Sequence, residues 1–543
     1  MRDRNREHTR ARSWWKSAWL FVLVVAAPGC GSGSSGSAPT TATATTTTTN
    51  GVKVSANEAV YNADCGRNET GTLFANAEVE PHLALNPARA SNLIAAWQQD
   101  RWSNGGARGL VAASSNDAGA TWTRRTLPFA RCSGGPFERA SDPWVTIGPT
   151  GVVQMMALAI TGELFTPGSS NAMLVVRSTD GGLTWSAPQT LIQDTGPFLN
   201  DKNSMTADPY DARYVYGGWD RLEQNNGGPA YFVRSADSGL TWESPRIVHD
   251  PGPTGQIIGA EIVVTTEGDL LYFFTGFQMV GTQNQASVVF VRSRDRGLTW
   301  SAPVVVSRLL PVGTRDPETG VAVRDGASLM HAAAGPGVVV VTWQDARFSN
   351  GARDGIAFSQ SRDGGVTWSG PVQINGAPAA GAFTAQPQVS ADGLISVGYF
   401  DLRANTPDPA TLPAQYWMAR SADGRTWTEA RIAGPFNLAN APNAGGSFVG
   451  DYVGLVTAGS SALSLLAISG DDVNNRTDVF FSIATLARAA TAGEPMPADG
   501  YRAIDAPRRP ISEELVEKTS AEIARDLGPK LTMRPPSRRA PDR

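Results

Sequence analysis

The chain has 543 residues, of which 46 are basic and 50 acidic, and its formal net charge is −4. This balance offers no general attraction to nucleic acid, so we expect no nucleic-acid partner. The chain has only four histidines and three cysteines, the usual zinc ligands, so we do not expect a zinc centre. We predict no cofactor, and the alternative is calcium, because clustered carboxylates and carbonyls suit that ion.

The first 29 residues predict an export signal, because basic residues up to Lys16 precede the apolar run Ala18–Ala27, which is too short to span a bilayer. Small residues then precede Cys30, in a pattern that is similar to a bacterial lipoprotein signal. We therefore predict a lipid on Cys30 and a location outside the cytoplasm at a membrane. Ordinary cleavage and secretion are the alternative. Residues 30–50 continue into a Gly-, Ser- and Thr-rich stretch that predicts a flexible tether.

Residues 51–79 are expected to lead into a repetitive domain over residues 80–486. Cys65 and Cys132 are the two cysteines that remain once Cys30 is set aside. In a chain routed to an oxidising compartment, an even pair predicts a disulfide. Two free buried thiols are the alternative.

The pattern Ser-x-Asp-x-Gly-x-Thr-Trp occurs six times at intervals of about 60 residues, the last copy being one residue shorter. We call each copy a box. Their aspartates are Asp117, Asp180, Asp237, Asp295, Asp363 and Asp423. A period of this length with several short strands predicts an all-β fold, a β-propeller of four-stranded blades.

In the first period we expect strands over His82–Asn86, Leu93–Trp97, Gly109–Ser114 and Thr123–Leu127, from their alternation and β-branched content. First strands recur near residues 82, 144, 205, 261, 328, 387 and 452. This count favours seven blades, with six as the alternative if one period is an insertion. The last period lacks a box, so we expect a strand near residues 52–60 or 485 to complete its blade and close the circle.

Each box has a structural explanation. Its Asp can accept backbone N–H bonds across a tight turn, its Gly permits a positive φ, and its Trp fills the wedge between sheets. Because strands alternate in direction within a blade, the box turn lies opposite the loops that join second and third strands. The boxes therefore predict which face is not the binding face.

The opposite face collects polar residues from two repeated places. Second strands end in Asp100-Arg101, Asp345-Ala346-Arg347 and Asp401-Leu402-Arg403, and first strands begin at or after Glu80, Asp142, Asp201-Lys202, Glu261, Arg324-Asp325, Gln386 and Asp451-Tyr452. This ring predicts a ligand site around the central channel. Local ion pairs are the alternative for any single Asp-x-Arg. The residues that break the repeat are the stronger candidates, namely Asp354, Arg324, Glu261 and Tyr452.

Residues 487–543 are rich in Pro, Arg and Ala. Within them Ile511, Leu515, Ile523 and Leu527 share one face of a helix predicted near residues 512–527. We expect this helix to pack on the rim of the propeller.

The boxes and the propeller resemble the sialidase (neuraminidase) superfamily over residues 80–486. Tyr452-Val453-Gly454-Leu455 is similar to the motif of the family's nucleophilic Tyr, and the stretch from Asp345 to Asp354 is similar to its Asp-x-Arg with a following acid/base Asp. Arg324 stands where the family's first-strand Arg would fall, although in the fifth period. In the first period Glu80 takes that place. A complete carboxylate-binding Arg triad cannot be assembled, so neutral or cationic sugars are alternatives to sialic acid.

The resemblance implies an exo-α-sialidase-like glycoside hydrolase at the cell surface, acting as a monomer on a glycan or glycoconjugate. Tyr452 would attack the sugar, Glu261 or Asp451 would take its proton, and Asp354 would protonate the leaving oxygen. Arg324, Arg347 and Arg403 would orient an anionic group. The alternative is a non-catalytic propeller that uses the same ring to bind a glycan or a protein.

Overall fold

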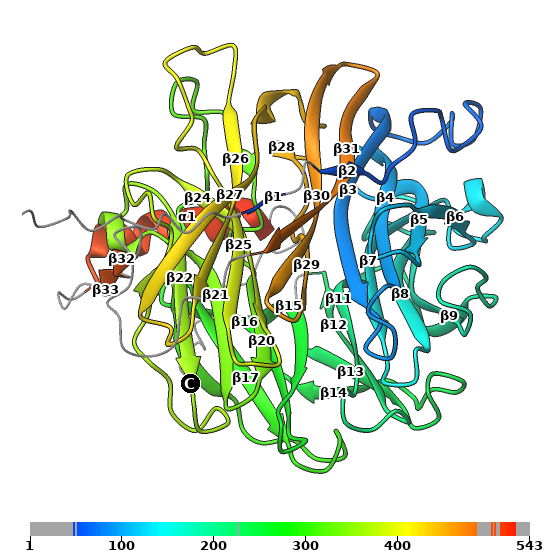
Figure 1. Cartoon of the computed structure of the whole chain (residues 1–543), viewed down its shortest axis with the longest axis horizontal. Helices are drawn as coiled ribbons and strands as arrows, with labels where there is room; N and C mark the ends of the chain where they lie inside the picture. Colours follow the sequence, from blue (N-terminus) through cyan, green and yellow to red (C-terminus); the bar gives the residue numbers. More distant parts are fainter. Residues whose placement is uncertain are drawn as a thin grey trace, which may run out of the picture. The chain divides into compact units, whose positions relative to one another are not determined.

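The structure is a computed structural model that describes residues 47–48, 51–224, 227–485, 501–502, 504–505 and 511–527 (Figure 1). The predicted export signal and Cys30 lie outside these residues, in the unit Met1–Thr43, and everything described belongs to the unit Ala44–Arg543. This part contains strands, three short 3-10 turns and one α-helix, so the predicted all-β class is confirmed. None of the helical residues described forms a span long and apolar enough to cross a membrane.

The described strands form seven successive groups, in which each strand is antiparallel to the next. The first four groups are β3 (Leu73–Leu85), β4 (Leu93–Trp102), β5 (Ala107–Ser115) and β6 (Thr123–Leu127); β7 (Arg139–Ile147), β8 (Val153–Thr161), β9 (Ser170–Ser178) and β10 (Gln189–Thr195); β11 (Phe198–Ala207), β12 (Val215–Glu223), β13 (Ala230–Ser235) and β14 (Arg246–His249); and β15 (Gly255–Val264), β16 (Leu270–Val280), β17 (Gln283–Ser293) and β18 (Val304–Leu309).

The fifth and sixth groups are β20 (Met330–Gly335), β21 (Val338–Asp345), β22 (Gly355–Ser361) and β23 (Val372–Gln373), then β24 (Ala382–Val389), β25 (Ile395–Asp401), β26 (Pro413–Ser421) and β27 (Thr426–Asn437). The seventh group has β29 (Gly454–Ala458), β30 (Ser461–Asp472) and β31 (Asn475–Thr485). Short strands outside this scheme are β1 (Thr47–Thr48), β19 (Val323–Arg324), β28 (Ser447–Phe448), β32 (Tyr501–Arg502) and β33 (Ile504–Asp505). We call the first strand of each group its inner strand.

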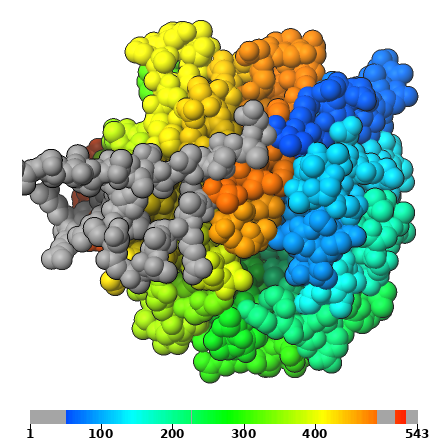
Figure 2. Space-filling model, viewed as in Figure 1, coloured from blue at the N-terminus to red at the C-terminus, as the bar shows by residue number. Residues whose placement is uncertain are grey.

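The N-terminal strand β2 (Val52–Lys53) completes the seventh group by pairing antiparallel with β31. The Val54 amide donates to the Val479 carbonyl at 2.7 Å, and Lys53 pairs with Asp478 at 2.7 Å. Strand β3 also meets β31, so the blue β3 and the orange β31 lie side by side (Figures 1 and 2). The first strands of the series, β2 and β3, therefore pair with its last strand, β31.

The first long strand starts before residue 80, the predicted start of the repetitive domain. Strand β3 begins at Leu73 and runs through Glu80, so the segment 51–79 already contains β2 and half of β3. The physical reason is a bulge: Glu80 has a left-handed backbone with φ of 53°, and the register to β4 shifts between Val79 and His82. The bulge breaks the alternation that a sequence pattern can detect.

Each box forms a tight turn between the third and fourth strands of its group. In the first box, the amide of Gly119 donates to Ser115 Oγ at 2.8 Å, while the amide and hydroxyl of Thr121 donate to Asp117 at 2.9 and 2.6 Å. These bonds from Thr121 lower the pKa of Asp117 to about 2. The same Asp contacts recur in the next four boxes and, without the hydroxyl bond, in the last. The box carboxylates are thus engaged within their own turns.

The box glycines pack against the preceding group. A Cβ added to Gly297, where φ is +82°, would lie 2.4 Å from the ring of Phe232 in the third group. At Gly119 the corresponding distance to Phe481 of the seventh group is 2.1 Å. A side chain at these positions would therefore push neighbouring groups apart.

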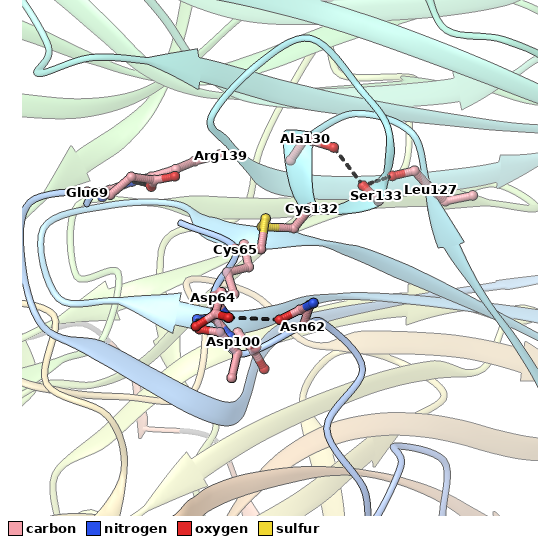
Figure 3. The surroundings of a disulfide bond; sticks show 12 residues. Asn62, Asp64, Cys65, Glu69, Asp100, Leu127, Ala130, Cys132, Ser133 and Arg139 are labelled. Carbon is pink, nitrogen blue, oxygen red and sulfur yellow. Dashed lines mark hydrogen bonds and ion pairs between the residues drawn. A yellow bond between two sulfur atoms is a disulfide. The ribbon is translucent and has the colours of Figure 1, made fainter. Parts of the chain in front are cut away.

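A disulfide between Cys65 and Cys132, with Cα atoms 5.7 Å apart, joins the segment before β3 to the 3-10 turn Arg131–Ser133 that follows β6 (Figure 3). Close by, Arg139 pairs with Glu69 at 2.7 Å, and both side chains are about 10% exposed. The N-terminal segment is therefore fixed to the first two groups both covalently and by charge.

The helix α1 (Glu513–Leu527) agrees with the predicted helix. Ser512 Oγ caps it by accepting from the Leu515 amide at 3.2 Å, and Leu515 and Ile523 are buried. Ser520 accepts from the amide of Asn284 in β17 at 2.9 Å. Ile511 departs from the prediction: it precedes the helix and is 39% exposed. Upstream, β32 pairs with β27 and β33 pairs with β23, so the C-terminal segment contacts the sixth, fifth and fourth groups.

Candidate functional site

Five inner strands carry the same bulge near their start. The bulged residues have a left-handed backbone and are Glu80 (φ 53°) in β3, Asp142 (φ 53°) in β7, Lys202 (φ 50°) in β11, Gly259 (φ 68°) in β15 and Thr384 (φ 49°) in β24. A bulge adds one residue to a strand and re-aims its side chain. Because inner strands start at the end opposite the box turns, the bulges belong to the face that the sequence analysis predicted for binding.

Six charged side chains at this end interact with one another, and we call them the central charge cluster. They are Glu80 of β3, Arg101 of β4, Asp142 of β7, Lys202 of β11, Arg324 of β19 and Asp451, which precedes β29. Asp451 pairs with Lys202 at 2.5 Å and with Arg324 at 2.9 Å. The guanidinium groups of Arg101 and Arg324 lie 5.1 and 4.3 Å from the centre of the Phe448 ring. Residues from distant parts of the chain therefore form one cluster.

Hydrogen bonds through Gln98 and Ser141 connect Glu80 with Asp142. Arg101 donates to Gln98 Oε1 at 2.7 Å, and Gln98 Nε2 donates to Glu80 and, at 3.0 Å, to Ser141 Oγ. Ser141 donates in turn to Asp142 Oδ1 at 2.6 Å. The second oxygen, Asp142 Oδ2, is buried and has no partner among the residues that the structure describes. Within the described chain, this oxygen lacks the hydrogen bond that buried polar atoms normally make.

Two carboxyl groups of the cluster have a raised pKa and the third has a lowered one. Burial, together with the charges of Asp142 and Asp451, raises the pKa of Glu80 to about 8. Burial also raises the pKa of Asp142, against the opposing effect of Lys202. For Asp451 burial acts in the same direction, but Arg324 and Lys202 outweigh it and hold the pKa well below its usual range. At neutral pH a protonated Glu80 therefore stands near an ionised Asp451.

The cluster is enclosed except at Arg324. The side chain of Arg324 is 31% exposed and that of Lys202 is 13% exposed, whereas Glu80, Arg101 and Asp451 are at most 3% exposed as residues. Burial and the neighbouring charge of Arg324 lower the pKa of Arg101 to about 10. A ligand from solvent would meet Arg324 first.

Tyr452, to which the resemblance gives the role of nucleophile, is buried between β3 and β7. It is 5% exposed, and its hydroxyl donates to the Pro143 carbonyl at 3.0 Å. Its ring lies edge-on to those of His82 and Trp144, with centroids 5.9 and 5.2 Å away. Burial raises its pKa well above the usual value. The hydroxyl hydrogen is therefore held by a backbone carbonyl and not by a carboxylate base.

Glu261 belongs to the channel wall and not to the central charge cluster. Its oxygens contact His331 Nδ1 and the Ala332 amide, each at 2.6 Å. It lines a cavity of about 310 Å³ to which all seven inner strands contribute, and which we call the central channel. Both carboxylate oxygens of Glu261, the predicted base for Tyr452, are thus engaged on β20.

Asp354 holds a loop. It is 1% exposed and accepts from the amides of Val312 and Gly313, each at 2.9 Å. Burial and the neighbouring Asp325 raise its pKa well above the usual value. The predicted acid/base residue therefore orders the chain before β19, away from the central charge cluster.

The Asp-x-Arg ends form local pairs. Asp345 binds Arg347 at 2.8 Å, and Asp401 binds Arg403, which also contacts Glu429. Arg347 further donates to the Arg308 carbonyl. Arg347 and Arg403, which were predicted to orient an anionic group, thus form local ion pairs in the structure.

Asp100 is used locally too. It accepts from the amide of Asn76 at 2.9 Å and from Arg108 at 3.3 Å. Of the predicted site residues, the ligand-binding Glu80, Arg101 and Arg324 and the catalytic Asp451 come together in the cluster. Asp142 and Lys202 were named at strand starts but were not singled out. Their position, equivalent to that of Glu80, was the signal that could have identified them.

Within the described part of the chain, no group of three or more His, Cys, Asp or Glu side chains is arranged to hold a metal ion. The charges of the cluster instead balance one another, with Lys202 and Arg324 on Asp451. We therefore assign no metal site.

Comparison with known proteins gives a family. The model of the BNR repeat-like domain matches residues 91–396, more than half of the 543 residues. Similar solved structures include a protein of unknown function from Dyadobacter fermentans (14% identity, 77% of this chain and 98% of that chain covered, TM-score 0.43), an α-L-arabinanase from Penicillium chrysogenum complexed with arabinobiose (13%, 80% and 98%, 0.45) and a sialidase from Trypanosoma rangeli (12%, 80% and 58%, 0.41). From the family match, the chain belongs to the BNR repeat-like domain family.

Proposed function

We propose that this chain is a sialidase-like glycoside hydrolase that removes terminal sugars at the central charge cluster. The observation that carries the proposal is Glu80, whose pKa of about 8 keeps its carboxyl protonated at neutral pH. A glycosidase needs such a neutral carboxylic acid to protonate the leaving oxygen. Carboxyl groups with strongly perturbed pKa values are candidates for catalysis.

The cluster supplies two carboxyl groups for this reaction. The proton of Glu80 passes to the glycosidic oxygen as the bond to the anomeric carbon breaks. Asp142, in its ionised form, takes a proton from the attacking water through Oδ2, the oxygen without a partner in the described residues. Asp451 holds Lys202 and Arg324 in place, and Arg324 extends to solvent where the sugar enters.

The proposal includes the architecture. Each four-stranded group is one blade, and β2 supplies the outer strand of the last, so the propeller has seven blades. Supporting this, the inner strands of all seven groups line the central channel. The box turns form the opposite face and stabilise it.

The proposal also includes the location. The chain is exported, carries a lipid on Cys30 that is its one link to a membrane, and acts as a monomer on glycans outside the cytoplasm. The disulfide of Cys65 and Cys132 supports an oxidising compartment.

The test is hydrolysis of aryl glycosides by the purified full chain, with an α-sialoside, an α-L-arabinofuranoside and a β-galactoside. We expect release of the fluorophore from at least one, and a loss of about 100-fold or more in kcat for Glu80→Gln. The matched control is Glu78→Gln, also in β3 and 1% exposed, whose carboxylate accepts from Gln99 outside the cluster. Equal rates for wild type and Glu80→Gln would refute the role of Glu80 as the general acid. If none of the three substrates is hydrolysed, the proposed hydrolase activity is refuted.

A further inference from the structure

A second cavity, of about 980 Å³, lies away from the central channel. Its walls are residues 312–317 before β19, residues 351–354 after β21, residues 377–381 before β24, Leu402–Arg403 after β25, and one side of α1. The strand-linked walls follow second strands or precede inner strands, so they belong to the face opposite the boxes. The volume is that of a site for a small organic ligand.

Basic side chains predominate in the lining. They are Arg315, Arg353, Arg403, Lys518 and Arg525. Arg353 is exposed, and its guanidinium has no hydrogen-bond or ion-pair partner among the described residues. Arg315 is 46% exposed, and its nearest acidic contact is Glu522 at 3.6 Å. The guanidinium of Arg353 is therefore available to a ligand, whereas that of Arg315 also donates to the Gly320 carbonyl at 3.4 Å and that of Arg403 is occupied by Asp401 and Glu429.

The acidic side chains of the lining do not cancel this charge. Three acidic residues line the cavity against five basic ones. Burial raises the pKa of Asp354 and of Glu522. At Asp316 burial acts in the same direction, but hydrogen bonds from Thr319 and from the Glu318 amide outweigh it and lower the pKa. The hydroxyl of Thr314 gives an independent indication of a ligand. Thr314 is 4% exposed, lines the cavity, and its Oγ1 is buried without a partner among the residues described. A buried hydroxyl in that state lacks the hydrogen bond that such groups normally make.

We propose that this cavity is a second binding site that takes the oxyanion of a small polar ligand, a carboxylate or a phosphate, on Arg353 and Arg315, with Thr314 donating a hydrogen bond. Guanidinium groups bind both anions in bidentate fashion. The helix α1 contributes Lys518 and Arg525 to the wall, so the site depends on the docked C-terminal segment. The proposal is independent of the hydrolase, since no residue of the central charge cluster lines this cavity.

The test is calorimetric titration of the full chain with inorganic phosphate and with glucuronate, and with glucose as the neutral probe. We expect at least one of the two anions to bind, and Arg353→Ala to weaken that binding about tenfold or more. Thr314→Val, which keeps the volume and removes the hydroxyl, should weaken it several-fold. The control is Arg362→Ala, an exposed arginine of the fifth box that contacts Gln360 on the other face.

The outcomes distinguish a phosphate from a carboxylate ligand, and this cavity from the central charge cluster. Binding of phosphate alone assigns a phosphate ester, and binding of glucuronate alone assigns a sugar acid. The proposal is overturned if neither anion binds, if glucose binds as well as the anions do, or if Arg353→Ala and Arg362→Ala bind equally. It is also overturned if Glu80→Gln abolishes anion binding, because the anion would then occupy the central charge cluster.

Discussion

Glu80 connects the chemistry of the cluster to the stability of the fold. Its pKa is about 8 in the folded chain against an ordinary 4.5, so between these values the native state binds more protons than the unfolded state. The free energy of unfolding therefore falls as pH rises through this window. Glu80→Gln removes the titrating group and should flatten the fall. Urea unfolding of the wild type and of Glu80→Gln at pH 5 and pH 8 measures this change in the free energy of unfolding. An identical fall in the two proteins would contradict the raised pKa of Glu80.

Tyr452→Phe tests the correction made to the sequence-based mechanism. The change removes one buried hydrogen bond, to the Pro143 carbonyl, and keeps the ring against His82 and Trp144. We expect a loss of about 1 kcal/mol in the free energy of unfolding and an unchanged kcat on the substrate that the wild type hydrolyses. If kcat collapses while the fold persists, Tyr452 takes part in the chemistry after all.

At the scale of the elements, the box turns lock neighbouring groups together. Gly297→Ala would put a methyl group 2.4 Å from Phe232 at a φ of +82°, whereas Gly268→Ala has a φ of +85° and nothing within 4 Å. Both variants carry the same backbone strain, so their difference isolates the clash. We expect Gly297→Ala to be less stable than Gly268→Ala by about 1 to 3 kcal/mol in chemical unfolding. Equal losses would mean that the box glycines act through φ alone.

At the scale of the whole described unit, the N-terminal segment fastens the first group to the last and, through the disulfide, to the second. The double variant Cys65→Ser/Cys132→Ser frees a loop with a sequence separation of 67 residues. We expect it to lose about 2 to 5 kcal/mol of stability. Dithiothreitol should destabilise the wild type by a similar amount and leave the double variant unchanged in the same unfolding assay. A reducing agent without effect on the wild type would contradict this role.

The all-β class could be predicted from the sequence because its signals are local. Asp117 and Thr121 bond within one turn, so the spelling of the box and its structure coincide. The cluster could be predicted only in part, because Lys202 and Arg324 meet Asp451 across 249 and 127 positions of sequence. No spacing encodes such a contact.

Two patterns were misleading for physical reasons. Asp345 and Arg347 have the residue types of a ligand site, but at a separation of two they satisfy one another. The short similarity around Tyr452 gave no information about the residue facing its hydroxyl, which is a backbone carbonyl of β7. In both places the role of the side chain depends on its burial and on its hydrogen-bond partner, which a sequence pattern does not show.

The repeated bulge has a consequence for how such a protein could change over generations. Glu, Asp, Lys, Gly and Thr occupy the same left-handed place in β3, β7, β11, β15 and β24, so this backbone accepts acidic, basic and small side chains alike. These residues lie at the same end of their groups, and Thr384 also donates to the Asp325 carbonyl at 3.0 Å. Gly259 and Thr384 lie outside the central charge cluster, so a substitution at either place would change this end of the sheets and leave the six charged side chains as they are.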